Sequence, residues 1–248
     1  MENKSLFPTE EVTLPSKGLI YPADNPLSKG VLEMKYMTAK EEDILTNETY
    51  IKNGTVIDKL LKSLIVTPIN YNDLVVGDKN AIMIAARVLG YGKDYTFNFE
   101  NEQHTVDLTE IKDKELKEEN LSEKGKNEFH FTLPTIKKEI TFKFLTHGDE
   151  SKIKSEVEGV KKVKKEKPEL STRMKHMILS VDGDYERKTI REFVDSSLLA
   201  RDARALRSYV KEIQPDVDLT YDLETEAGSV KGVTIPIGIS FFWPDTGL

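Results

Sequence analysis

The chain has 248 residues, of which 38% are apolar and 32% are charged, and its formal net charge is −7. This length can form one large domain or two small ones, and the apolar content is too high for a wholly disordered chain. The absence of cysteine excludes disulfide bonds and thiolate zinc sites, and the acidic balance disfavours a protein that follows the phosphates of nucleic acid.

Residues 1–38 contain four prolines, which prevent a helix and predict an extended segment. Within it, residues 31–37 alternate as a strand does. The side chains expected to face the core are Leu32, Met34 and Tyr36.

Three helices are expected next. Thr38 and Glu41 have the spacing of a capping box, which starts the first of them. Apolar residues then recur at helical spacing, and glycine or proline ends each run. The predicted helices run from Thr38 to Asn53, over 56–66 and over 79–89.

The following part changes to a strand pattern. Residues 95–99 alternate strictly, and 105–108 can return beside them as a hairpin. Two further alternating runs, 128–133 and 139–145, predict a small antiparallel sheet. The charged stretch 110–128 is expected to be a loop or a short helix.

Residues 149–169 are rich in lysine and acidic residues, and they fit either a thin amphipathic helix or a hinge. Pro236 marks the last apolar run of the chain as an edge strand or a bulge. Three helices and two strands are expected after the charged segment, over 170–181, 186–194, 198–213, 217–223 and 233–242.

These elements predict an α+β fold, in which helical groups combine with small antiparallel hairpins or sheets. The predicted organisation is an N-terminal α+β domain over 1–148, a charged linker or thin helix over 149–169, and a C-terminal part over 170–248. Each half places helices before an alternating β segment, so two similar halves are one arrangement that the pattern allows.

The chemistry of the chain is sparse. The four histidines are not spaced as zinc ligands, and His130, between two phenylalanines of a predicted strand, should face solvent. Gly90 and Gly92 lack the third glycine of a dinucleotide-binding loop. We therefore assign no catalytic, cofactor-binding or metal-binding residue. The histidines are His104, His130, His147 and His176.

Two segments could contact partners. Residues 161–165 are basic, but glutamates flank them and no aromatic residue lies among them, so a solvated helix face or linker is favoured over nucleic-acid binding. The aromatic run 241–243 either packs on the core or anchors a partner.

No stretch approaches the roughly 18 apolar residues that span a bilayer. No secretory signal is expected either.

Five short segments are notable for the order in which they follow one another along the chain. They are Leu14–Pro22, Met37–Asn47, Gly54–Leu61, Val76–Ile82 and Phe241–Pro244. This series resembles a family of baseplate proteins from T4-like contractile-tailed phages. The resemblance is strongest over 14–92 and 233–244 and weak over 112–170.

The resemblance implies a role in assembly of the baseplate hub, without catalysis and without a cofactor. Many relatives carry two Cys-x-x-Cys pairs where this chain has Glu100–Gln103 and Glu224–Ala227, which implies metal-free hairpins here. The expected partners are other hub or tail proteins, in the host cytoplasm during assembly. The acidic composition favours an assembly factor, and the alternative is a structural hub subunit in the virion baseplate. Candidate partner-binding residues are Leu19, Tyr21, Phe241, Phe242 and Trp243.

Overall fold

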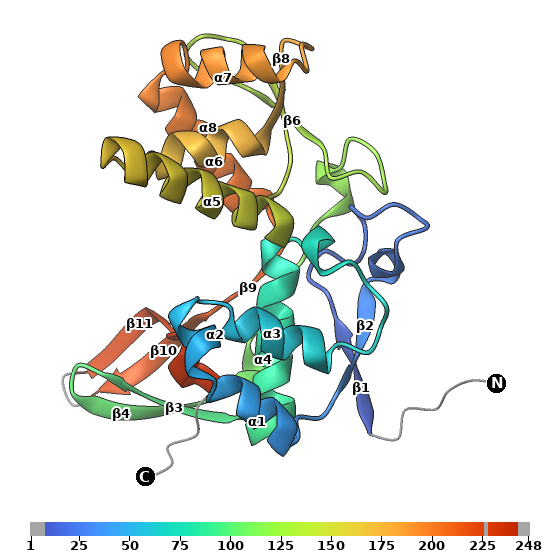
Figure 1. Ribbon diagram of the computed structural model, residues 1–248, viewed down its shortest axis with the longest axis vertical. Helices are drawn as coiled ribbons and strands as arrows, with labels where there is room; N and C mark the ends of the chain where they lie inside the picture. The colour runs from blue at the N-terminus through green and yellow to red at the C-terminus, as the bar shows by residue number, and fades with distance from the viewer. Residues whose placement is uncertain (1–7, 226–227, 243–248) are drawn as a thin grey trace.

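The computed structural model describes residues 8–225 and 228–242, and they form two lobes (Figure 1). The predicted α+β class is confirmed, because eight helices combine with antiparallel sheets of two or three strands in the described part of the chain. Short 3-10 turns occur at Pro26–Lys29 (η1), Tyr71–Asp73 (η2), Leu108–Glu110 (η3), Glu118–Asn120 (η4) and Ile239–Phe242 (η5).

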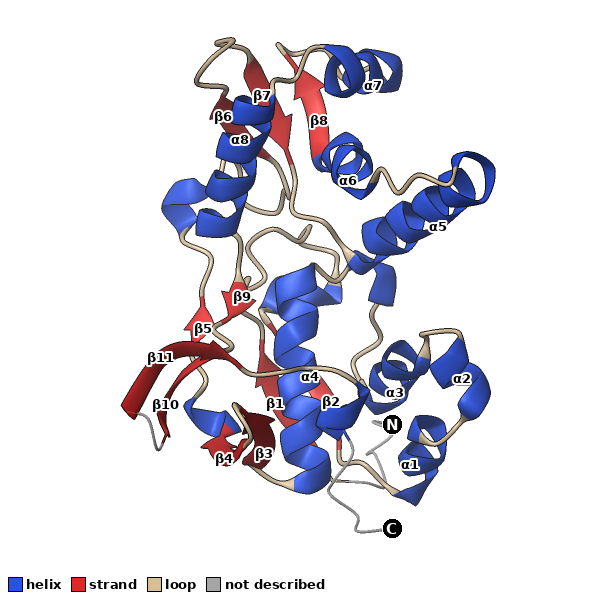
Figure 2. Cartoon of the chain, turned by 90° about the vertical axis from the view of Figure 1, so that its left-hand side faces the viewer, coloured by secondary structure: helices blue, strands red, loops and turns tan. Residues whose placement is uncertain are grey.

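The first lobe surrounds the long helix α4, Val76–Tyr91. Its other helices are α1 (Ala39–Leu45), α2 (Glu48–Lys52) and α3 (Val56–Leu64). Its strands are β1 (Thr9–Thr13), β2 (Val31–Lys35), β3 (Asp94–Phe99), β4 (Glu102–Asp107), β5 (Asp113–Lys114), β9 (Asp216–Val217), β10 (Thr220–Thr225) and β11 (Gly228–Thr234). The strands pair as four separate two-stranded sheets around α4 (Figure 2).

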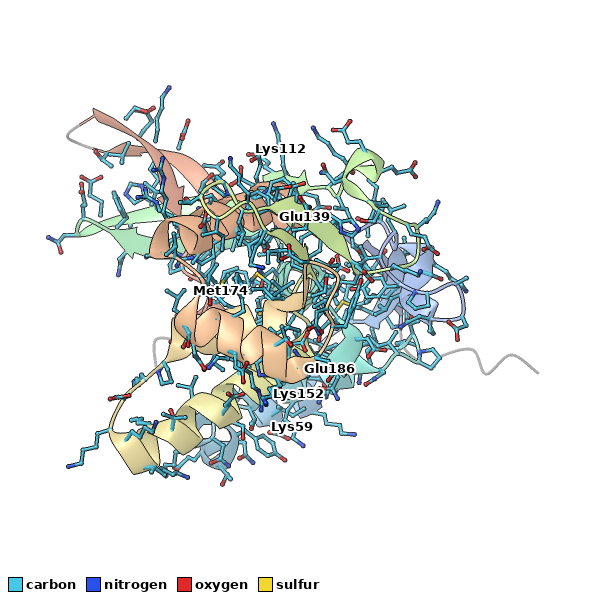
Figure 3. All side chains as sticks on the ribbon, turned by 90° about the horizontal axis from the view of Figure 1, so that it is seen from above. Lys59, Lys112, Glu139, Lys152, Met174 and Glu186 are labelled. Carbon is cyan, nitrogen blue, oxygen red and sulfur yellow. The ribbon has the colours of Figure 1, made fainter. Side chains whose placement is uncertain are left out.

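The second lobe has a three-stranded antiparallel sheet in the order β6-β7-β8, packed with helices. The strands are β6 (Phe129–Thr132), β7 (Glu139–Phe142) and β8 (Ile178–Val181). The helices are α5 (His147–Lys164), α6 (Glu169–Met177), α7 (Arg187–Ser196) and α8 (Ala200–Ile213). Figure 3 labels charged side chains of both lobes together with Met174 of α6, which is buried.

The division of the chain differs from the one predicted from the sequence. Strand β7 pairs with β8, with Ile140 opposite Val181, and β5 pairs with β9, with Asp113 opposite Val217. Both pairings join residues on either side of the predicted boundaries at 148 and 170. Strand pairing between distant segments therefore returns the end of the chain to the first lobe, and 149–169 is not a linker between two halves.

The charged segment is a helix, which confirms one of its two interpretations. Thr146 and Asp149 form a capping box at the start of α5, and Asp149 also accepts two hydrogen bonds from Lys143 at 2.7 and 2.8 Å. Only one narrow face of α5 is buried, through Ile153 and Val157. The basic residues 161–165 form the last turn and cap of this helix, where lysines complement the negative end of the helix dipole.

Two predicted elements end early. The helix predicted over 170–181 stops at Met177, because Ile178–Val181 pairs with β7 instead. The apolar run predicted as a strand over 233–242 leaves β11 at Thr234. Pro236 has no backbone N–H for a strand ladder, and after it the chain turns into η5.

The remaining β pattern largely follows the prediction. The hairpin of β3 and β4 places Phe99 opposite Glu102, and Glu100 and Asn101 take the positive φ values of a two-residue turn. Leu32 and Met34 of β2 are buried as expected. Tyr36 is only half-buried, because its hydroxyl donates to Glu10 at the surface.

Within the described residues, no helix is long and apolar enough to cross a membrane.

Candidate functional site

The first turn of α4 is the junction of the two lobes. The backbone N–H of Val76 donates to the carbonyl of Leu145 at 3.2 Å, and that of His147 donates to Leu74 at 2.7 Å. A β-bridge joins Val75 and Thr146. The carbonyl of Leu145 thus satisfies one of the free N–H groups at the start of the helix, which lacks a polar capping side chain.

The same turn also touches the returning end of the chain. A Cβ added at Gly77 would lie 1.9 Å from the carbonyl oxygen of Pro215 and 2.9 Å from the Cα of Asp216. Asn80, one turn later, donates to the Asp216 carboxylate at 2.8 Å. Gly77 therefore permits a backbone contact that any side chain would block.

A buried carboxylate fixes the N-terminal segment to this turn. Asp78 is fully buried and accepts three hydrogen bonds: from the Ser16 N–H at 2.9 Å, the Ser16 hydroxyl at 2.7 Å and the Tyr21 hydroxyl at 2.6 Å. The Tyr21 oxygen in turn accepts the N–H of Val75 at 3.1 Å. Burial raises the pKa of Asp78 to about 6, against the effect of the bonds from Tyr21 and Ser16. The group is thus ionised at neutral pH, next to the positive end of the helix dipole.

The segment Leu14–Pro22 is consequently part of the interior. Leu19 and Tyr21, two of the candidate partner-binding residues, are only 6% and 5% exposed, so in this structure their side chains lie in the interior. Gly18 has a φ of +73°, and a Cβ there would lie 2.3 Å from the carbonyl oxygen of Ser28. The segment is shaped to close a tight loop and to present Ser16 and Tyr21 to Asp78.

The aromatic residues near the C-terminus also belong to the core. Phe241 and Phe242 are fully buried, and the ring of Phe241 meets that of Tyr95 edge-on, with centroids 4.8 Å apart. The Tyr95 hydroxyl donates to the carbonyl of Pro236 at 3.2 Å. Of the two alternatives for this run, Phe241 and Phe242 thus take the packing on the core, and Trp243 lies outside the described residues.

A groove of about 550 Å³ opens between α3 of the first lobe and α5 and α6 of the second; we call it the interlobe groove. At its base, Asp58 accepts hydrogen bonds from Lys79 at 2.6 Å and from Tyr71 at 3.0 Å. His147 lies beside them, with Nε2 3.8 Å from Asp58 and its ring edge-on to Tyr71. These four side chains come from four elements of the chain: α3, η2, α4 and α5.

The charges at the base of the groove influence the protonation of Asp58 and His147. Partial burial acts to raise the pKa of Asp58, but Lys79 and His147 outweigh it and hold the pKa below its ordinary value. Burial lowers the pKa of His147, and the charges of Lys79 and Lys62 act in the same direction. At neutral pH, Asp58 is therefore ionised and His147 is neutral.

The wall of the groove is braced by an ion pair between α5 and α6. The guanidinium of Arg173 donates to both oxygens of Glu150, at 2.6 and 2.7 Å, and this bond raises the pKa of Arg173. A bidentate pair of this kind fixes the relative orientation of its two side chains as well as adding energy. Arg173 and Glu150 on the wall, like Lys79 and Asp58 at the base, are thus held in contact with each other.

The groove brings a histidine, a carboxylate and a serine together, and each of them has other hydrogen-bond or ionic contacts. The hydroxyl of Ser151 donates to the backbone carbonyl of His147 at 3.0 Å, not to the imidazole. His147 Nδ1 lies 3.4 Å from the ammonium of Lys79. A general base would need the serine hydroxyl on its ring nitrogen, and in this structure the two groups do not make that contact.

The hairpins that carry cysteine pairs in the resembling family have other side chains here. Glu100 and Asn101 form the β3–β4 turn, and Glu224 lies opposite Ser229 in the β10–β11 hairpin. Ala227 is outside the described residues. Across the described ranges, no group of three histidine, aspartate or glutamate side chains could hold a metal ion.

The other three histidines do not line the interlobe groove. His130 is exposed, as expected from its strand position. His104 is buried between Phe97 and Phe99 of the β3–β4 hairpin, and His176 lies 3.1 Å from Glu156.

Comparison of the chain with protein-family models, with curated proteins and with solved structures finds no match in any of the three.

Proposed function

We propose that the chain is a non-enzymatic tail protein of a T4-like phage that acts in assembly of the baseplate hub. In this proposal it binds hub proteins as an assembly factor in the host cytoplasm and is not retained. One observation carries the proposal. Two of the segments on which the resemblance rests, Leu14–Pro22 and Val76–Ile82, contact each other through Ser16, Tyr21 and Asp78.

This contact matters because short segments can resemble a family by chance. Chance similarity gives no reason for the matching segments to meet in space. Here they meet at a buried carboxylate, at the point where both lobes and the end of the chain converge. These two segments thus share one buried contact, as expected for segments that a family keeps because its fold needs them.

The distribution of exposed apolar side chains supports an assembly factor over a permanent subunit. Large apolar side chains with more than a third of their surface exposed are scattered over both lobes. In the described residues they are Val66, Val76, Val163, Leu170, Tyr185 and Leu199. A permanent subunit usually buries a continuous apolar interface, whereas a reversible binder keeps its apolar patches small.

The test is quantitative mass spectrometry of purified phage particles beside the lysate of infected cells. The proposal predicts a protein that is abundant in lysate, absent from particles, and co-purified with hub proteins through an affinity tag. A fixed copy number in particles would instead establish the alternative, a structural hub subunit. Failure to co-purify any baseplate protein, together with absence from particles, would refute both.

A further inference from the structure

A second groove, of about 380 Å³, lies along α4 and β1; we call it the α4 groove. Its floor is apolar and includes Val12 of β1, Val88 and Leu89 of α4, and Ile111. Each of these side chains packs against the core while keeping part of its surface exposed. Lys112 lies between two residues that line this groove, Ile111 and Asp113. In Figure 3 it is on the opposite side of the molecule from Lys59 of α3 and Lys152 of α5.

The rim of the α4 groove has a single sign of charge. Its charged lining residues are Glu10, Glu11 and Asp113, and no basic side chain lines it among the described residues. Glu10 accepts the hydroxyl of Tyr36, while Glu11 is exposed. Partial burial and the neighbouring Glu115 raise the pKa of Asp113, because both act against its ionised form.

The groove also borders a strand edge. In the described residues β1 pairs only with β2, and the far side of β2 is bonded by the N–H of Val66 to the Glu33 carbonyl. One edge of β1 is therefore left without a strand, and it is the β1 residues 10–13 that line the groove. An open edge of this kind is a template on which an extended peptide can pair.

We propose that the α4 groove binds an extended segment of a partner protein in which apolar side chains alternate with lysine or arginine. Such a segment pairs with the edge of β1, places its apolar side chains on Val88 and Leu89, and places its cations near Glu11 and Asp113. The alternation of a strand sends neighbouring side chains to opposite faces, so one face meets the apolar floor and the other meets the acidic rim. This inference rests on the surface alone and stands if the phage proposal fails.

The first test uses two fluorescein-labelled nine-residue peptides, one alternating lysine with valine and one alternating glutamate with valine. Fluorescence anisotropy with the full chain should show binding of the lysine peptide and about tenfold weaker binding of the glutamate peptide. A tenfold difference in affinity corresponds to about 1.4 kcal/mol, which we assign to the charges of the rim. The double variant Glu11→Lys, Asp113→Lys changes exposed side chains only. It should reverse the preference between the two peptides.

The second test separates the floor from general apolar binding. Val88→Glu puts a charge on the floor and should abolish binding of the lysine peptide. The matched control is Val163→Glu. Val163 lies near the end of α5 and is 82% exposed, so this change should leave peptide binding unchanged. If circular dichroism shows that Val88→Glu does not fold, the peptide preference of the charge-reversed variant still tests the proposal.

Four results of the peptide-binding tests would overturn the proposal: binding of neither peptide, equal binding of both, an unchanged preference in the charge-reversed variant, or equal effects of the two valine variants. Analytical ultracentrifugation tests the other occupant. Self-association of the wild type that the charge-reversed variant abolishes would assign the groove to a second copy of the chain, and the proposal of a foreign partner would fall.

Discussion

Replacing Tyr21 by phenylalanine removes one oxygen from the buried network at the lobe junction and leaves the ring in place. The lost hydroxyl donates to the Asp78 carboxylate and accepts the N–H of Val75. A hydrogen bond to a charged group contributes about 1.5–3 kcal/mol, and a buried N–H left without an acceptor costs about 1–3 kcal/mol. We expect Tyr21→Phe to lower the free energy of unfolding by about 3 kcal/mol, and Tm by about 6–12 °C for a chain of this length.

The loss should depend on pH, with a sign fixed by Asp78. Its folded pKa, about 6, lies above the ordinary value of 3.8, so this group favours the folded state most at low pH, and that contribution declines as pH rises from about 4 to 6. Tyr21→Phe removes a bond to the ionised form and should raise this pKa further. The destabilisation should therefore be larger at pH 8 than at pH 5, by about 1 kcal/mol for each unit of added pKa shift.

Urea unfolding at the two pH values measures both quantities, since the urea midpoint multiplied by its slope gives the free energy of unfolding. The matched control is Tyr36→Phe, which removes a hydroxyl bonded to Glu10 at the surface and should leave the urea midpoint unchanged. Equal losses for the two variants, or a Tyr21→Phe loss that is the same at pH 5 and pH 8, would refute the role given to Asp78.

Three further substitutions test other parts of the fold. Gly77→Ala drives a methyl group into the backbone at Pro215 and should cost about 3 kcal/mol; an unchanged urea midpoint would contradict the close approach of α4 to that segment. Gly159→Ala, at a helical position with open space around the added carbon, should instead raise stability by about 0.5–1 kcal/mol, and a loss would be the opposite of the expected result. Phe241→Ala should cost about 3–5 kcal/mol in thermal or urea unfolding, whereas a partner anchor at that position would leave the free protein as stable as before.

The sequence predicts elements whose pattern is local. Helix α3 follows from the spacing of Leu60, Leu61 and Leu64, and the β3–β4 hairpin follows from strict alternation. The start of α4 is missed by three residues, because the helix has no polar capping side chain and its first N–H bonds to Leu145 instead. Strand β8 is missed because Ile178–Val181 reads as the last turn of a helix until it pairs with β7, which is distant in sequence.

The candidate sites depend on contacts between distant residues, which a single sequence does not reveal. Tyr21 and Asp78 are 57 residues apart, so an exposed role for Tyr21 could not be rejected beforehand. A signal was present at Asp78, which lies one helical turn before the buried Ile82 and so shares its face. In the interlobe groove, Lys79 and His147 are 68 residues apart, and no local pattern links them.

The central claim is that the chain acts in hub assembly by binding. The most direct measurement is electron microscopy of cells infected with a phage whose gene for this chain has an early stop codon, with completed baseplates counted against the unmodified phage. We predict that baseplate subunits accumulate while completed baseplates and infectious particles fall sharply, and that the chain supplied from a plasmid restores both. Normal numbers of completed baseplates and infectious particles in the absence of the chain would contradict the account.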